Sequence, residues 1–176
     1  MSLYEATPDL ELVRRFLQDR SQASFESLYD RHSPYLYRVA FRMLHKDRSA
    51  AEDALQEAWI RAATCLSRFR GDSTLRTWLC GITMNCCREV WRRRTFVPID
   101  EVPEPLSPSR ADRLQGLRLE RALAQLDEDS REMIELYDVL GHTHDEVASI
   151  LDIAPGTSKS RLFRARATLR RILGTD

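Results

Sequence analysis

The sequence predicts an all-α protein made of two small helical domains that a flexible linker joins. Three observations favour this fold class. Apolar residues recur at the three- and four-residue spacing of helices along most of the chain, and the alternation typical of strands is scarce. Four of the seven prolines fall within residues 95–109. Basic residues gather in two segments, one on each side of this stretch, and 176 residues suffice for two small domains.

The first domain is expected to contain several amphipathic helices. An apolar stripe begins within residues 25–32. Ser33-Pro34 then predicts that a second helix starts or kinks there, because serine caps helices and proline fits the first helical position. Ser49 and Glu52 have the capping-box spacing, in which each side chain satisfies a free amide of the first turn. The next helix is therefore expected from residue 49 to about residue 68.

A loop and one more helix are expected to complete the first domain, residues 1–94. Phe69-Arg70-Gly71-Asp72-Ser73 breaks the helical pattern, and a helix is expected from about residue 74 to residue 94. Residues 95–109 hold four prolines and several acidic side chains. Proline removes amide donors and disfavours helix in the preceding residue, so this stretch is expected to be an extended acidic linker. The second domain is then expected over residues 110–176.

The second domain has the pattern of a helix-turn-helix unit. A helix expected over residues 130–140 is followed by Gly141, a residue common at helix C-termini. Thr143 and Glu146 form another capping-box pattern, which opens a short helix. After a turn, Pro155 introduces the last helix. A short capped helix, a tight turn and a longer basic helix favour DNA binding.

The formal net charge is zero, but the charge is unevenly distributed. Residues 61–94 hold eight arginines and two acidic residues, and residues 155–176 hold six basic residues and one acidic residue. Two basic segments in a neutral chain indicate two contacts with a polyanion. Solvated helix faces are the alternative explanation of either segment.

The last helix is expected to place one face on its domain and another on DNA. Residues four and three apart make the packing face: Ser158, Leu162, Ala165, Leu169 and Ile172. Because the first turns of a recognition helix enter the major groove, the candidates for base edges are Lys159, Ser160, Phe163 and Arg164. The candidates for phosphate are Arg161, Arg166, Arg170 and Arg171. An acidic protein is the alternative partner of such a helix.

Three segments resemble a known family. Residues 156–166 read G-T-S-K-S-R-L-F-R-A-R, which closely resembles the G-T-V-K-S-R-L-F-R-A-R signature of bacterial sigma factors of the extracytoplasmic-function (ECF) group. Residues 53–58 resemble the family's D-L-x-Q-E-A/T segment. Residues 69–73, followed by Thr77-Trp78-Leu79 and Asn85, resemble its F-R-G-D-S…T-W-L…N segment. The order, the spacing and the linker match over about residues 10–173.

The resemblance implies a transcription initiation factor with a division of labour. The first domain would be similar to sigma domain 2, which docks on core RNA polymerase and opens DNA at the −10 element. The second would be similar to sigma domain 4, which reads the −35 element. The implied polymerase contacts are Asp53, Gln56 and Glu57. The implied −10 contacts, which include a loop that captures a flipped base, are Arg61, Phe69, Asp72, Ser73, Asn85 and Arg88. The implied −35 contacts are Lys159, Ser160, Arg161, Phe163, Arg164 and Arg166.

Several positions depart from the family's pattern, among them Asp127 and Ser130, which differ from its L-P-E-x-x-R segment. Ser158 replaces an apolar residue on the inward face, which leaves a hydroxyl to satisfy. Gly81 stands where arginine is common, so one expected phosphate contact is missing and the helix is weakened there. Pro155 is shifted by one place, which leaves the start of the recognition helix open.

The expected partners and location also follow from the resemblance. The partners are core RNA polymerase, promoter DNA and an anti-sigma factor, and the free protein is expected to be a monomer. No apolar run approaches the length of a membrane span, and residues 1–9 lack the features of a secretory signal. A bacterial cytoplasmic protein is therefore expected, which an anti-sigma factor can hold at the membrane. The four cysteines are expected to act as small buried hydrophobes.

Two other function classes compete with this interpretation. A stand-alone helix-turn-helix regulator would dimerise and bind a palindrome. A metal-binding sensor or enzyme is suggested by His142 and His144 and by Cys86-Cys87, although adjacent helix positions diverge by about 100°. No carboxylate pair, nucleophile with a base or phosphate-binding glycine loop stands out. We therefore expect no catalytic residue, no metal site and no cofactor, and not an enzyme.

Overall fold

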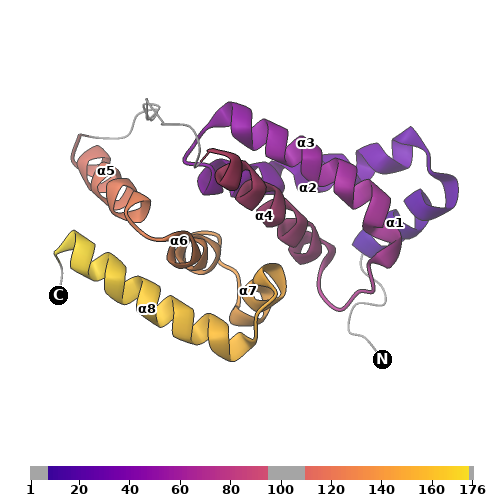
Figure 1. Cartoon of the computed structure of the whole chain (residues 1–176). Coiled ribbons are helices and arrows are strands. Elements are labelled where there is room, and N and C mark those ends of the chain that lie inside the picture. The colour runs from indigo at the N-terminus through magenta and orange to yellow at the C-terminus, as the bar shows by residue number, and fades with distance from the viewer. Residues whose placement is uncertain (1–7, 95–109, 175–176) are drawn as a thin grey trace. The chain divides into compact units, whose positions relative to one another are not determined.

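The computed structural model describes residues 8–94 and 110–174, and every regular element within these ranges is helical (Figure 1). The all-α prediction is therefore confirmed. In chain order the elements are α1 (Pro8–Asp19), α2 (Gln22–Met43), α3 (Arg48–Cys65), η1 (Leu66–Arg68), α4 (Leu75–Arg94), α5 (Arg110–Ala124), α6 (Glu128–Ile134), η2 (Glu135–Val139), α7 (His144–Leu151) and α8 (Pro155–Leu173). The chain divides into two compact units: the first contains α1 to α4, and the second contains α5, α6, η2, α8 and most of α7. The expected linker, residues 95–109, lies outside the described residues.

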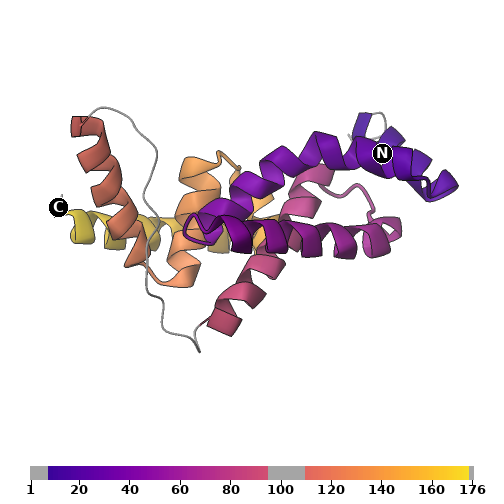
Figure 2. The ribbon, with the colours of Figure 1, turned by 90° about the horizontal axis from the view of Figure 1, so that it is seen from above.

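Helices α2, α3 and α4 form the body of the first unit. Helices α2 and α3 run side by side in opposite directions, and α4 packs on both (Figures 1 and 2). Most buried residues of α3 are alanines, such as Ala51, Ala54 and Ala58, which allow neighbouring helices to approach closely, and the larger ones are Leu55 and Trp59. Helix α1 packs on α2, where the Phe16 and Phe25 ring centroids are 5.7 Å apart. This body fixes the outward faces of α2, α3 and α4.

The structure corrects two expectations in the first unit. Helix α2 continues through Pro34, so no second helix starts there. Ser33 is buried and accepts a hydrogen bond from Trp59 of α3, so tertiary packing outweighs the local break that proline favours. Helix α3 starts at Arg48, and its cap is Asp47, whose carboxylate accepts from the Ala50 amide at 2.9 Å. The predicted Ser49–Glu52 capping box is therefore wrong, because a better acceptor lies two residues earlier.

The second unit confirms most of the expected helix-turn-helix pattern. Thr143 and Glu146 form the predicted capping box, and Gly141 adopts a positive φ of 75°, which favours glycine. Helix α8 starts at Pro155, which settles the open start of this helix. The helix expected over residues 130–140 starts earlier, at Glu128, and its second half (η2) is a π-helical turn.

The described residues include no helix with both the length and the apolar character that crossing a membrane requires.

Candidate nucleic-acid and protein interfaces

Helix α8 separates a packing side from an exposed side. Ser158, Leu162 and Ala165 are buried, as their spacing predicts. The exposed side carries the four residues expected at base edges: Lys159, Ser160, Phe163 and Arg164. The Phe163 ring is 74% exposed. A large apolar ring among cations is unfavourable in water alone but suits contact with the methyl groups and edges of bases.

The other two candidate −35 residues lie at the borders of the packing side and are held by carboxylates. Arg161 forms an ion pair with Asp129 at 3.1 Å. Arg166 donates to both carboxylate oxygens of Asp138, with Nε 3.1 Å from Oδ2. These hydrogen bonds raise the pKa of Arg166. Because the two pairs lie on opposite flanks of α8, they fix its rotation about its own axis.

The buried Ser158 hydroxyl has a partner inside the helix-turn-helix. Its Oγ lies 2.9 Å from Nδ1 of His144, the first residue of α7. The His144 ring in turn packs on Tyr137, with centroids 4.4 Å apart. The hydroxyl that replaces an apolar group on the inward face therefore links the two helices of the motif by a directional bond.

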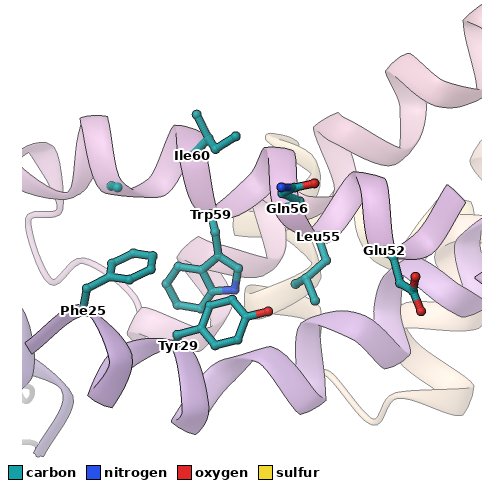
Figure 3. Close-up of a pocket in the computed structure, with 8 residues that line it drawn as sticks. Phe25, Tyr29, Glu52, Leu55, Gln56, Trp59 and Ile60 are labelled. Carbon is teal, nitrogen blue, oxygen red and sulfur yellow. The ribbon is translucent and has the colours of Figure 1, made fainter. Parts of the chain in front are cut away.

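A groove on the first unit runs between α2 and α3 (Figure 3). Its volume is about 690 Å³. Its lining is mainly apolar and consists of Phe25, Tyr29, Leu55, Trp59, Ile60 and Ala63, with Glu52 and Gln56 as polar members. The Trp59 indole is held in place because Nε1 donates to Ser33 Oγ at 2.9 Å, and its ring lies 5.5 Å from Phe25 and 5.3 Å from Tyr29.

The groove adjoins the residues that were expected to contact polymerase. Gln56 lines it, and Asp53 and Glu57 stand on the same helix within one turn. Ile60 is 57% exposed in the groove wall. Exposed apolar side chains gathered beside polar ones are typical of protein-binding surfaces. The motif did not predict the aromatic part of this groove, although the adjacent apolar pair Trp59-Ile60 widens the apolar face of α3 beyond one stripe.

The loop between η1 and α4 bounds a second, smaller pocket of about 80 Å³. It is lined by Asp9, Leu10, Phe69, Gly71, Ser73, Thr74 and Leu75. The turn at Gly71 has a positive φ of 76°, which favours glycine. The Phe69 ring packs on Trp78, with centroids 5.5 Å apart. The structure thus brings Phe69 and Ser73 together in one concave site and leaves Asp72 exposed outside its lining.

Asn85 and Arg88 lie farther along α4. Arg88 Nη1 donates to Asn85 Oδ1 at 3.3 Å. Asn85 follows Leu75 of the small pocket by ten residues, which is about 15 Å along a helix. Asn85 is therefore not part of that pocket and lies apart from it along α4.

Arg61 and Glu57, expected to serve different partners, bind each other. Arg61 donates to both carboxylate oxygens of Glu89 at 2.6 and 2.7 Å, and to Glu57 Oε1 at 2.6 Å. These hydrogen bonds raise the pKa of Arg61, and the bond to Arg61 lowers the pKa of Glu89. The Arg61–Glu89 pair ties α3 to α4, and Glu57 holds Arg61 from its own helix.

The suggested metal ligands do not gather in the described residues, where no group of three or more His, Cys, Asp or Glu side chains is placed to hold an ion. Cys80, Cys86 and Cys87 are buried and Cys65 is half-buried, all as free thiols. Burial raises the pKa of the Cys86 thiol to about 11, which makes it unreactive at neutral pH.

Comparison with known proteins assigns the two units to one family. The model of Sigma-70 region 2 matches residues 28–97, and the model of Sigma-70, region 4 matches residues 116–169. The ECF RNA polymerase sigma factor SigM of Mycobacterium tuberculosis is 34% identical over 154 residues, which cover 86% of this chain and 78% of that protein. The chain belongs to the ECF RNA polymerase sigma factors.

Two solved structures resemble this ECF sigma factor. CnrH in complex with the cytosolic domain of CnrY is 29% identical, with a TM-score of 0.69 over 94% of this chain and 96% of that chain. RpoE from Bartonella quintana, in complex with the anti-sigma factor NepR, is 27% identical, with a TM-score of 0.68 over 86% of this chain and 98% of that chain.

As an ECF sigma factor, the protein is a transcription initiation factor that directs RNA polymerase to promoters. A stand-alone helix-turn-helix regulator is not favoured, because the region 2 match covers all of the groove lining except Phe25, together with the loop between η1 and α4. Sigma factors are non-catalytic transcription factors.

Proposed function

We propose that the groove between α2 and α3 is the main contact with core RNA polymerase, with Asp53, Gln56 and Glu57 on its border. The observation that carries this proposal is the apolar lining of the groove, with Tyr29 and Ile60 exposed above the buried Trp59, in the unit that matches region 2. Carboxylates beside an apolar groove fit a helical partner with basic and apolar side chains, as in other helix-in-groove contacts.

Substitutions in the groove test this contact directly. Ile60→Glu places a charge in an exposed position of the groove wall and is expected to weaken binding to core polymerase at least tenfold. Leu119→Glu is the matched control, because Leu119 is an exposed apolar residue of the second unit. Binding is measured with purified core polymerase and full-length protein. Equal binding by the two variants would reject the groove as the contact.

We infer that α8 reads the −35 element through its exposed side. Lys159, Ser160, Phe163 and Arg164 face solvent together, and Arg161 and Arg166 stand at the flanks, where phosphates of the two DNA strands pass a recognition helix. Since both flanking arginines are held by carboxylates, phosphate contact at these positions requires exchange of partners.

The −10 element is proposed to meet the first unit at the loop and along α4. A pocket lined by Phe69, Ser73 and Thr74 combines an apolar wall with polar residues, the combination that a flipped base needs. Asn85 and Arg88 supply a second subsite, and Asp72 borders the loop. Arg61 completes the set if phosphate replaces Glu89. Run-off transcription and permanganate detection of unpaired thymines, with Phe69→Ala and Asn85→Ala, test both subsites.

We infer that this is a non-enzymatic, monomeric protein of the bacterial cytoplasm. We also infer that an anti-sigma factor sequesters it, in some settings at the membrane. Its likeness to RpoE, which is in complex with the anti-sigma factor NepR, supports such a partner. Capture of the full-length protein from its host, followed by competition with core polymerase, tests it. A captured protein that leaves polymerase binding unchanged would count against sequestration.

A further inference from the structure

Two arginines from different helices meet at one aromatic ring of the first unit. Tyr35 lies on α2, Arg38 stands one turn later, and Arg76 lies in the first turn of α4. The guanidinium carbon of Arg38 is 5.7 Å from the centre of the Tyr35 ring, and that of Arg76 is 5.2 Å from the same centre. Both arginines are exposed, whereas Tyr35 is half-buried. The ring therefore holds two cations in a defined place on the surface.

The electrostatic surroundings of these two cations differ from those of Arg31 and Arg61. Within the described residues neither Arg38 nor Arg76 forms an ion pair with a carboxylate, whereas Arg31 is paired with Asp9 at 2.6 Å and Arg61 with Glu89. Two like charges at one ring repel each other, and the ring faces offset only part of that cost. An anion that binds both would relieve the repulsion.

Arg76 of this pair lies next to the small pocket in the sequence. Arg76 directly follows Leu75, which lines the pocket together with Phe69 and Ser73. Buried His32 lies on the other side, 3.4 Å from Asp9 of the pocket wall, and Arg31 and Arg76 both lower its pKa after the larger effect of burial. Arg31, Arg76 and the N-terminal end of the α4 dipole therefore bring positive charge next to the pocket, beside the Asp9 carboxylate.

We propose that Arg38, Tyr35 and Arg76 form a phosphate clamp that binds the backbone of single-stranded DNA next to the base held in the small pocket. This inference rests on the proposed −10 function of that pocket. The planar guanidinium groups are held by one ring, so less side-chain freedom is lost when each donates to phosphate oxygens. The clamp extends the DNA surface from α4 onto α2, to residues that no motif marks.

The clamp predicts a specific salt dependence. Each phosphate contact with single-stranded DNA contributes about 0.7 to the slope of log affinity against log salt, so Arg38→Ala/Arg76→Ala is expected to lower the slope by about 1.4. The probe is a fork-junction DNA that carries the −10 strand of a promoter selected by the wild-type holoenzyme. The control pair is Arg14→Ala/Arg48→Ala, which removes two exposed arginines of the same unit and is expected to leave the slope unchanged.

Further variants distinguish loss of the clamp from a general loss of positive charge and from loss of folding. Arg38→Lys/Arg76→Lys keeps the charges and is expected to keep the slope, with weaker binding. Tyr35→Leu keeps both arginines but removes the ring, and it is expected to weaken fork binding while polymerase affinity stays the same. A slope equal to that of the control pair would overturn the clamp. Loss of polymerase binding without a change in slope would overturn it in favour of an acidic protein contact.

Fork binding by the wild-type holoenzyme distinguishes failure of the proposed −10 function from failure of the clamp alone. If it fails to bind the fork, the proposed −10 function fails. If it binds and the Arg38/Arg76 variant behaves like its control, only the clamp fails.

Discussion

Arg166 of α8 donates two hydrogen bonds to Asp138 of η2, one to each carboxylate oxygen. Its guanidinium also lies over the Tyr137 ring, 5.5 Å from the ring centre. Arg161 holds Asp129 on the other flank of the helix. Carboxylates of the protein thus occupy the two arginines that we propose as phosphate contacts, and α8 is less basic in the folded protein than its sequence indicates.

Asp138→Asn is expected to strengthen binding to promoter duplex. Removal of the carboxylate charge frees Arg166 for phosphate, and loss of a partly exposed ion pair corresponds to about a twofold to fivefold change in affinity. One more duplex phosphate contact also makes the salt slope steeper by about 0.9. Holoenzyme binding to promoter DNA is measured at several salt concentrations. Glu128→Gln, which removes another exposed acidic charge of the unit, is the control. Weaker binding would show that Asp138 serves only to position α8.

Ser158→Ala is expected to destabilise the helix-turn-helix. The variant leaves His144 Nδ1 without its partner at a partly buried site, which costs about 1–2 kcal/mol of the free energy of unfolding. Ser160→Ala, at an exposed position, is the control. The measurement is chemical denaturation of the full chain. In a double-mutant cycle with His144→Ala, additive losses would mean that the two side chains do not interact.

Phe163→Ala is expected to weaken −35 recognition while the fold stays intact. Because the ring is 74% exposed, its removal leaves no cavity, and the melting temperature should change little. Loss of an apolar contact with a base should weaken promoter binding about tenfold. Selection from a promoter library with a randomised −35 region gives the readout. An unchanged −35 preference would exclude Phe163 from base contact, and the −10 preference is the internal control.

The folding stability of the first unit is expected to fall between pH 7.5 and pH 5.5. His32 is 2% exposed, and its pKa is lowered from 6.5, first by burial and then by Arg31 and Arg76, with Asp9 opposing. A lowered histidine pKa means that the unfolded chain binds the proton more readily, so stability is lost as the pH falls through about 6.5. Carboxylates with lowered pKa values, such as Asp19 and Asp127, lose their contribution only below this range.

The melting temperature of the full chain at the two pH values measures this effect. His32→Gln keeps a polar side chain of similar size but does not titrate, so most of the pH dependence should disappear. If the variant melts with the same pH dependence as the wild type, another group is responsible.

Local sequence signals predicted the helices well where the deciding interaction is local. The Thr143–Glu146 capping box, the glycine turn at Gly141 and the start at Pro155 all depend on neighbouring residues. The cap of α3 was misassigned because Asp47 and Ser49 both carry suitable acceptors and only one can be used. A helix start at Pro34 was wrong because α2 is stabilised from outside, through its contacts with α3 and α4.

The candidate sites were predictable as lists of residues but not as arrangements. Nothing local to Arg166 indicates Asp138, which lies 28 positions earlier, and nothing local to Arg61 indicates Glu89. The small pocket recruits Asp9 and Leu10 from α1, which no motif marks. Such pairs depend on how helices cross, and that geometry is set by the whole core.

The π-helical turn η2 has a consequence for how this protein can vary. Its wide winding, closed by the Leu140 amide on the Glu135 carbonyl at 2.9 Å, carries one residue more than a regular helical turn. Deleting a single residue there would rotate the upstream helix by about 100° relative to the downstream helices. Tyr137 and Asp138 would then swing away from His144 and Arg166 together. The segment is therefore expected to accept substitutions more readily than changes in length. The number of residues in η2 matters more for its role than any one of its side chains.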